Sequence, residues 1–195
     1  MTDSTTDRAT ADQPQPSKRD RLVTAAVQLL HENGIERTTL ADIAHAAHVP
    51  PGNVYYYFKT KDDIIGAVIQ AHTHDINATL AAIDAQHRTP KARLKALIHE
   101  LAGQSQTVAR HGCPLGSLCT ELNKRTNPTA ADLMRRLTTW AEQQFRDAGH
   151  RRDAHQLALE LIAAYEGHAL LANTLQDPDI LTAAARRLGS RIDKL

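Results

Sequence analysis

Two adjacent prolines interrupt a helical stretch near position 50, and this interruption constrains the fold more than any other feature of the chain. Before it, the Thr39 hydroxyl can cap a helix whose apolar residues share one face: Leu40, Ile43, Ala44 and Ala47. Pro50 disfavours helical geometry at Val49, and Pro51 suits the first turn of a new helix. The pattern predicts two short helices joined by a tight turn, which is a helix-turn-helix.

The second of these helices carries polar and aromatic side chains on its outer faces. Val54 and Phe58 are four residues apart and can face inward, whereas the remaining positions hold Asn53, Tyr55, Tyr56 and Tyr57. Tyrosine hydroxyls and an asparagine amide suit phosphates and base edges, and an α-helix fits the major groove of DNA. The segment predicts a DNA-reading helix, with an ordinary tyrosine-rich packing helix as the alternative.

The flanking segments extend the pattern in both directions. Upstream, residues 19–33 have apolar side chains at helical spacing and end at Gly34, which suits a left-handed helix end. Downstream, Lys59 and Lys61 precede the next amphipathic run, and a lysine beside the backbone amides of a helix start can bind a phosphate. These lysines would fix the register of the reading helix.

In combination these segments resemble the DNA-binding domain of the TetR family of repressors. The resemblance covers residues 18–66 and rests on the helix ending at Asn33-Gly34-Ile35, on the capped helix at 39–44, and on the spacing of Val49, Gly52, Tyr55, Phe58, Lys59 and Lys61. It implies an all-α homodimer in which three N-terminal helices bind DNA. Roughly six further helices would form a ligand pocket and a dimer interface.

The resemblance also implies roles for single residues. By position, the DNA contacts would come from Thr39, Gly52, Asn53, Tyr55, Tyr56 and Lys61. Thr39 would contact a phosphate, and Asn53 and Tyr56 would reach base edges. Two departures stand out: His48 replaces a common glycine of the turn, and the two prolines replace residues that often donate to DNA.

The organisation of the chain follows from composition and periodicity. Residues 1–17 hold almost no large apolar side chain and are expected to form a disordered tail. We assign residues 18–62 to the helix-turn-helix domain and 63–195 to an effector-binding and dimerisation domain. In that second part, helices are expected near these ranges: 61–86, 91–110, 129–148, 153–174 and 178–193.

The last two helices carry the expected dimer interface. The resemblance implies a four-helix bundle across the dimer axis, where small residues would allow close approach: Ala163, Ala164, Gly167 and Ala169. Packing of these helices within a single chain is the alternative.

A second motif with possible chemistry is Gly112-Cys113-Pro114. Gly112 permits a sharp turn and Pro114 suits the first helical position, so Cys113 is expected at a helix N-cap, where the helix dipole favours a thiolate. The Gly-Cys-x-x-x-x-Leu-x-x-Glu pattern resembles a TetR subgroup that includes repressors of quinone- and aldehyde-detoxifying genes, in some of which the matching cysteine is the sensor. The alternative is that Cys113 and Cys119 are small buried core residues.

Other candidate sites have weaker support in the sequence. Trp140 and His168 are candidate effector-pocket residues because pocket-forming helices are expected to carry them, although core packing is the alternative. The close histidine pairs His72/His74 and His45/His48 do not favour a metal site, because the first pair diverges on a helix and the second belongs to the DNA-binding unit. We expect no metal and no cofactor.

Charge and hydropathy limit the remaining function classes. The formal net charge is +1, and residues 18–61 hold six Lys or Arg against four Asp or Glu, so a non-specific DNA-coating protein is disfavoured. No apolar run is long enough to span a bilayer or to serve as a secretory signal, which predicts a cytoplasmic protein.

We therefore expect a non-enzymatic, ligand-responsive homodimeric repressor. It would be released from a palindromic double-stranded operator by a small hydrophobic or electrophilic effector. The rival interpretation is a cysteine-dependent enzyme or thiol-based redox sensor that uses Cys113.

Overall fold

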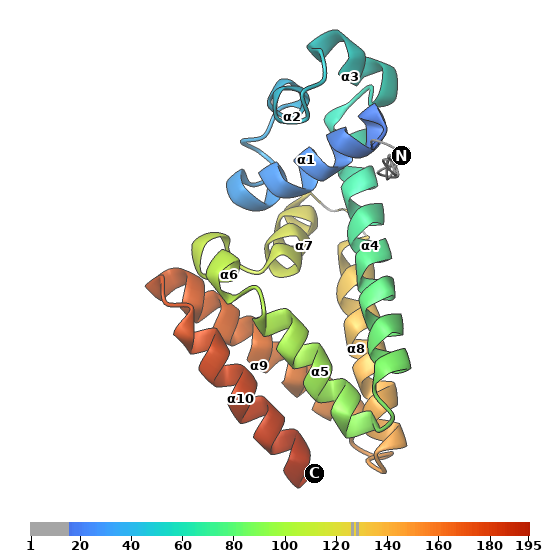
Figure 1. The fold of residues 1–195 in the computed structure, drawn as a ribbon, viewed down its shortest axis with the longest axis vertical. Helices are drawn as coiled ribbons and strands as arrows, with labels where there is room; N and C mark the ends of the chain where they lie inside the picture. The colour runs from blue at the N-terminus through green and yellow to red at the C-terminus, as the bar shows by residue number, and fades with distance from the viewer. Residues whose placement is uncertain (1–15, 126, 128) are drawn as a thin grey trace, which may run out of the picture.

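The N-terminal unit consists of three short helices packed around apolar side chains. The computed structural model describes residues 16–125, 127 and 129–195, so positions 1–15 of the predicted tail lie outside the described residues. The three helices are α1 (Lys18–Asn33), α2 (Leu40–Ala46) and α3 (Pro51–Tyr57). Ser17 caps α1 by accepting from the amide of Asp20. The predicted helix-turn-helix is present at the top of the molecule (Figure 1).

A single long helix, α4 (Lys61–Gln86), runs from this unit along the rest of the molecule (Figure 1). It begins in a capping box, in which the amide of Asp63 donates to Thr60 Oγ1 at 3.1 Å and the amide of Thr60 donates to Asp63 Oδ2 at 2.9 Å. The sequence has no proline between Pro51 and Pro90, so none falls within this helix. The predicted domain boundary at 62/63 therefore falls inside the first turn of α4.

The next segment differs from the expected single helix over residues 91–110. It forms α5 (Pro90–Ala102) and α6 (Ser105–His111), which are separated at Gly103 and Gln104. The apolar period of the segment runs through this break, which is why periodicity alone gives one helix. Glycine has a low helix propensity, which makes Gly103 a weak point at which the chain can turn.

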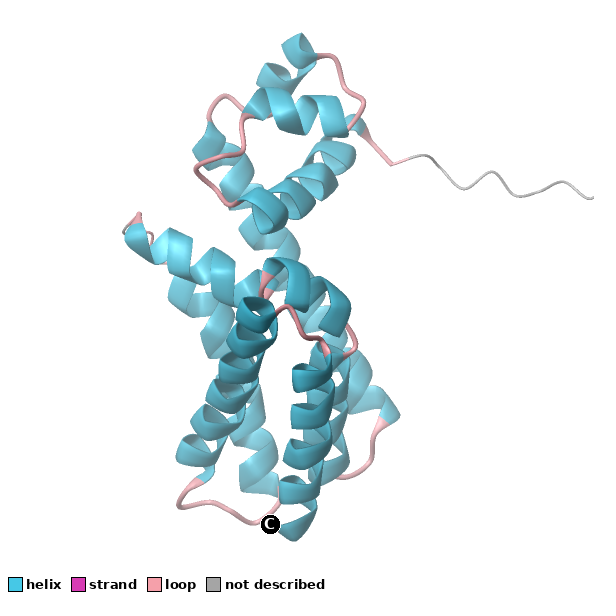
Figure 2. Cartoon of the chain, turned by 90° about the vertical axis from the view of Figure 1, so that its left-hand side faces the viewer, coloured by secondary structure: helices cyan, strands magenta, loops and turns pink. Residues whose placement is uncertain are grey.

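Four more helices complete the body: α7 (Pro114–Lys124), α8 (Ala130–Asp147), α9 (Ala154–Leu175) and α10 (Asp179–Lys194). In Figure 1, α7 lies directly below α1, and α5, α9 and α10 lie beside one another further down. Figure 2 shows only helices and loops in the part of the chain that the structure describes. The all-α prediction is confirmed, with ten described helices where about nine were expected.

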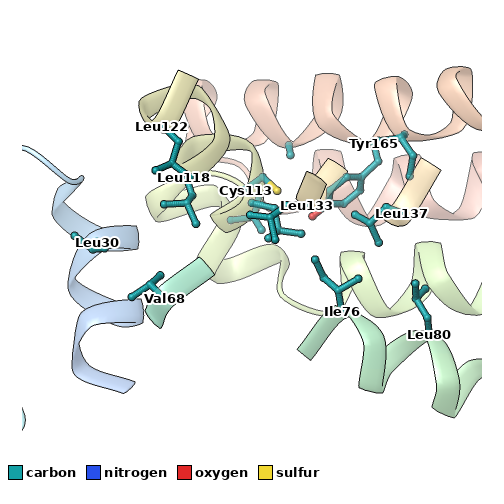
Figure 3. Close-up of a cluster of buried hydrophobic side chains, with 14 of the residues drawn as sticks. Leu30, Val68, Ile76, Leu80, Cys113, Leu118, Leu122, Leu133, Leu137 and Tyr165 are labelled. Atoms are coloured by element: carbon teal, nitrogen blue, oxygen red, sulfur yellow. The ribbon is translucent and has the colours of Figure 1, made fainter. Parts of the chain in front are cut away.

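The hydrophobic core continues from the N-terminal unit into the body without a gap. Leu22, Ile43 and Val54 are buried in the first part, and Leu94, Leu122 and Leu133 are buried in the second, all within one cluster. Figure 3 shows Leu30 and Val68 beside Leu118 and Leu122 where the two parts meet. Among the described helices, none has the length and apolar character needed to cross a membrane.

Candidate DNA-binding surface and effector cavity

Local hydrogen bonds cap the start of α2, and a residue with a left-handed backbone lies in the turn between α2 and α3. Thr39 Oγ1 accepts from the amide of Asp42 at 3.1 Å, and Asp42 Oδ2 accepts from the amide of Thr39 at 2.9 Å. These bonds, with a further one from the Thr39 hydroxyl, lower the pKa of Asp42. His48 has a φ of +52°, in the left-handed region where the family pattern has glycine.

The helix α3 exposes the residues predicted to read DNA. Pro51 occupies its first turn as expected, and Val54 and Phe58 are buried beneath it. On the outside, Tyr56 is 78% exposed and Tyr55 is 54% exposed, and Asn53 is half-buried. The space beside Gly52 is open, so a backbone can approach there closely. Adjacent exposed aromatic side chains on one short helix are a feature of partner-binding surfaces.

Lys61, which is predicted to contact a phosphate, makes a hydrogen bond within the protein. It is half-buried, and its Nζ atom donates to the carbonyl oxygen of Glu36 at 3.2 Å. Lys61 therefore ties the loop between α1 and α2 to the start of α4. A phosphate contact by this ammonium would have to share the charge with that loop or replace the bond.

The end of α7 holds the N-terminal unit at three points. The Glu121 carboxylate accepts from the backbone amide of Ile35 at 2.6 Å. Arg125 donates to Glu36 Oε1 at 2.6 Å and to Asp62 Oδ1 at 2.7 Å, so one guanidinium bridges the α1–α2 loop and the start of α4. We call this set of contacts the α7 hook.

Glycine at position 34 makes the hook possible. Gly34 has φ +82° and ψ 165°, a conformation open essentially only to glycine; the predicted positive φ is present, but the ψ is not that of a left-handed helix end. A Cβ atom at this position would lie 2.9 Å from Glu121 Oε1. The carboxylate therefore approaches the end of α1 more closely than any side chain would allow.

A cavity of about 320 Å³ lies between the N-terminal unit and the body. Its walls come from α1, α4, α5 and the start of α7, with contributions from α8 and α9; the apolar part includes Val27, Ile76, Leu97, Leu115 and Leu137. The polar groups are Gln28, His31, His72, Asp75, Thr79, Glu100, Gln104 and the Tyr165 hydroxyl. Among the described lining residues there is no lysine or arginine. A mostly apolar cavity with a few polar groups is typical of a small-molecule site.

The histidines of this cavity are held by the surrounding structure. His31 Nε2 donates to the carbonyl oxygen of Gly112 at 2.9 Å, and its ring packs edge-on against His111. Burial lowers the pKa of His72, so this ring is neutral at physiological pH. His31 thus links the last turn of α1 to the residue that precedes Cys113.

Cys113 lines the cavity. The prediction that its N-cap position favours a thiolate is wrong. Cys113 caps α7 as predicted, with Sγ accepting from the amide of Gly116 at 3.4 Å. The side chain is 7% exposed, and burial together with Glu166 raises its pKa to about 12. The thiol instead donates to Glu166 Oε1 at 3.2 Å. Desolvation outweighs the helix dipole here.

The surroundings of Cys119 also favour a protonated thiol. Burial and Glu166 raise the pKa of Cys119 to about 11. Burial also raises the pKa of Glu166 and of Tyr165. Figure 3 shows the Cys113 sulfur among leucine side chains, with the Tyr165 ring nearby. Both thiols are therefore held in their protonated form.

Two predicted pocket residues lie elsewhere. Trp140 is half-buried and its Nε1 donates to Asp84 Oδ2 at 3.1 Å, at an open groove between α4 and α8. His168 is half-buried on α9, where its Nδ1 atom donates to the carbonyl oxygen of Ala164 at 2.6 Å. Neither residue lines the cavity, because α8 and α9 turn other positions, Leu137 and Tyr165, toward it.

Several lining residues had no sequence signal. Gln28 and His31 belong to the predicted DNA-binding domain, and nothing in their spacing points to a ligand. Tyr165 was identifiable only as a helical core position. No group of three or more possible metal ligands occurs within the described residues.

The helix α9 leaves a row of leucines in solvent: Leu159, Leu170, Leu171 and Leu175. Ala163 and Gly167 are exposed on the same helix. Ala169 is different, since it is buried within its own chain and is not available to a partner. Leu170 is the most exposed of the row, at 66%.

Comparison with known families identifies both parts of the chain. The family described as "Bacterial regulatory proteins, tetR family" matches residues 22–68, and "Tetracyclin repressor-like, C-terminal domain" matches residues 90–188. The second match covers the part of the cavity wall that comes from α5, α7, α8 and α9, together with the exposed row of α9.

Individual proteins agree with these matches. The chain is 31% identical to the transcriptional regulator AcuR of Cereibacter sphaeroides, over 86% of this chain and 82% of that protein. It is 28% identical to the HTH-type transcriptional repressor DhaR of Mycobacterium sp. (strain GP1), over 64% of this chain and 62% of that protein. The crystal structure of a regulatory protein TetR from Rhodobacter sphaeroides superimposes with a TM-score of 0.74 at 26% identity, over 87% and 96% of the two chains.

Proposed function

Because the chain belongs to the TetR family of bacterial regulatory proteins, and is therefore a DNA-binding transcriptional regulator and not an enzyme, we propose that it acts as an effector-responsive homodimeric repressor. The observation that carries this proposal is the pairing of an exposed reading helix with a cavity whose wall includes α1. Such a protein works in the cytoplasm, beside the DNA that it binds.

The DNA contacts follow from the exposed faces of α2, α3 and α4. We assign base contacts to Asn53 and Tyr56, whose amide and hydroxyl both donate and accept. Tyr55 and the hydroxyl of Thr39 would bind phosphate, and Gly52 would let the backbone approach the duplex. Lys61 would contribute partly through the loop that it fixes.

The homodimer would form through the exposed row of α9. Isolated leucines on a surface are ordinary, but Leu170, Leu171 and Leu175 are exposed within the last turns of one helix, with Leu159 exposed further toward its start. Ala163 and Gly167 lack bulk on that helix, so a second copy of α9 can approach closely. A two-fold axis through this row would place two copies of α3 to read a palindrome.

The effector would be a small, mostly apolar molecule that binds reversibly in the cavity between α1 and the body. A molecule bearing an anionic group is disfavoured, because Asp75 and Glu100 line the cavity and no described lining residue is a lysine or arginine. A covalent electrophile is also disfavoured, since the Cys113 thiol is protonated at physiological pH. The thiol-sensor alternative loses its main physical support for the same reason.

Selection from a random duplex library tests this function. The wild-type protein is expected to enrich one palindromic sequence, and footprinting should show two symmetric half-sites. Tyr55→Ala should weaken binding to that sequence by about tenfold or more, and Lys61→Ala by less. A protein that enriches no sequence, or a Tyr55→Ala variant with unchanged affinity, would contradict the proposal or its reading surface respectively.

A further inference from the structure

The helix α7 contacts the cavity with its first residues and the N-terminal unit with its last. Cys113, Pro114 and Leu115 line the cavity at its start. Glu121 and Arg125 form the α7 hook at its end. The helix is short and has no proline or glycine after Gly116, so a displacement of its first turn moves the hook as well.

The hook holds the parts of the N-terminal unit that set the direction of the reading helix. Glu121 fixes the amide that follows the end of α1, and Arg125 joins Glu36 to Asp62 at the start of α4. The α1–α2 loop is therefore fixed from below, and α2 and α3 follow directly from it. Lys61 fixes the same loop from its other side.

We propose that α7 couples occupancy of the cavity to the orientation of the reading helix, with Glu121 as the positioning residue and Arg125 as its support. This inference rests on the proposed effector-responsive function. In the effector-free state the hook holds the N-terminal unit in its DNA-binding orientation. An effector that displaces the Cys113–Leu115 turn releases it.

Glu121 is the decisive residue because of where its carboxylate lies. It accepts from a backbone amide of a part-buried loop, at a distance shorter than a typical N–H···O bond. Gly34 leaves the room for that approach. Removing the carboxylate leaves the Ile35 amide without this partner while the apolar contacts of α7, at Leu118 and Leu122, stay in place.

The first test compares variants of the α7 hook on the operator obtained by library selection. Glu121→Ala is expected to weaken operator binding by about tenfold or more, within the usual range of coupling between sites. Glu121→Gln keeps an acceptor oxygen and should fall between this variant and the wild type. Lys124→Ala, at an exposed neighbouring position on α7, is the matched control and should bind like the wild type.

Two measurements separate positioning from general stability. Hydrogen exchange at the Ile35 amide should accelerate in Glu121→Ala, and the thermal midpoint should stay close to that of the wild type. Operator affinity within twofold of the wild type in a folded variant with an exchanging Ile35 amide would overturn the proposal, as would tighter binding. Arg125→Ala gives a second, independent release of the hook and should weaken binding in the same direction.

A double-mutant cycle tests the link to the cavity. Leu115→Phe adds bulk at the cavity end of α7 and is expected to weaken operator binding in the wild-type background. In the Glu121→Ala background it should add little, because the hook is already released. Fully additive losses would show that the signal takes another route and would overturn the coupling role of α7.

The outcomes distinguish this inference from the function on which it rests. If the wild-type protein selects no operator, the proposed function fails and the inference fails with it. If the wild type selects an operator and the hook variants bind it equally well, only the inference fails.

Discussion

Tyr56 on α3 and Tyr165 on α9 are the same residue type in opposite surroundings. The first is 78% exposed on the N-terminal unit, whereas the second is 4% exposed and lines the cavity of the body. Tyr56 packs against little more than Tyr57, edge to face. Tyr165 donates from its hydroxyl to the carbonyl oxygen of Leu101 at 3.4 Å.

The difference separates two ways of preparing a surface for a partner. The N-terminal unit leaves large side chains in water and keeps its own fold with the apolar residues that are buried beneath them. The body buries its functional groups away from water. Burial changes their protonation, as the raised pKa of Cys113 shows. We therefore expect substitutions on the first surface to change the free energy of unfolding little, and substitutions in the cavity wall to change it strongly.

Cysteine reactivity gives the largest expected contrast between the two regions. In a Cys119→Ser background, Cys113 should react with iodoacetamide at pH 7.5 about a thousandfold more slowly than a cysteine introduced by Tyr56→Cys in a cysteine-free variant. A raised thiol pKa means that the thiolate appears only as the pH approaches 12, so the Cys113 rate should still rise with pH at pH 9.5. Equal rates at pH 7.5 would remove the distinction.

Truncation of the two tyrosines tests stability and binding in opposite directions. Tyr165→Ala should lower the free energy of unfolding by about 3 kcal/mol, because a buried aromatic ring is removed from the cavity wall. Tyr56→Ala should change that free energy by less than about 0.5 kcal/mol while weakening operator binding. Urea titration and gel-shift titration of both variants measure the contrast. A large stability loss in Tyr56→Ala would break the comparison.

The exposed row of α9 differs from the rest of the body, because its large apolar side chains lie in solvent. Introducing a charged side chain into this row tests whether a partner covers it. Leu170→Asp is expected to convert the dimer to monomer at micromolar concentration and to weaken operator binding by about a hundredfold, since one half-site remains for each monomer. Light scattering gives the mass, and circular dichroism confirms folding. Lys124→Ala serves as a surface control, and a dimeric Leu170→Asp variant would refute this interface.

The smallest expected effect concerns the turn of the N-terminal unit. His48→Gly removes a side chain from the left-handed region, at φ +52°, and should stabilise the protein by at most about 1 kcal/mol. The loss of conformational freedom by glycine on folding offsets part of that gain. A thermal midpoint that falls instead would show that the imidazole has a packing role in the turn.

Local interactions account for what the sequence could predict. The caps at Thr39 and Cys113 and the proline start of α3 involve residues within a few positions of one another, so their pattern is visible in the chain. The same holds for the exposed face of α3, which is set by helical spacing from Val54 and Phe58.

Long-range contacts account for what it could not. Burial of Cys113, together with Glu166 from 53 residues away, reverses the expected direction of the Cys113 pKa. Asp84 holds Trp140 from 56 residues away, at a groove outside the cavity. Glu121 and Ile35 are 86 residues apart, and no periodicity links them. The cavity itself exists only where helices distant in sequence meet.

The position of α1 has a practical consequence for modular engineering. Chimeric regulators are assembled by joining the DNA-binding domain of one protein to the effector-binding domain of another. With a junction near residue 62, such an exchange would also replace Val27, Gln28 and His31 in the cavity wall. The chimera would inherit a new ligand preference together with its new target sequence, unless these three α1 positions are transplanted back.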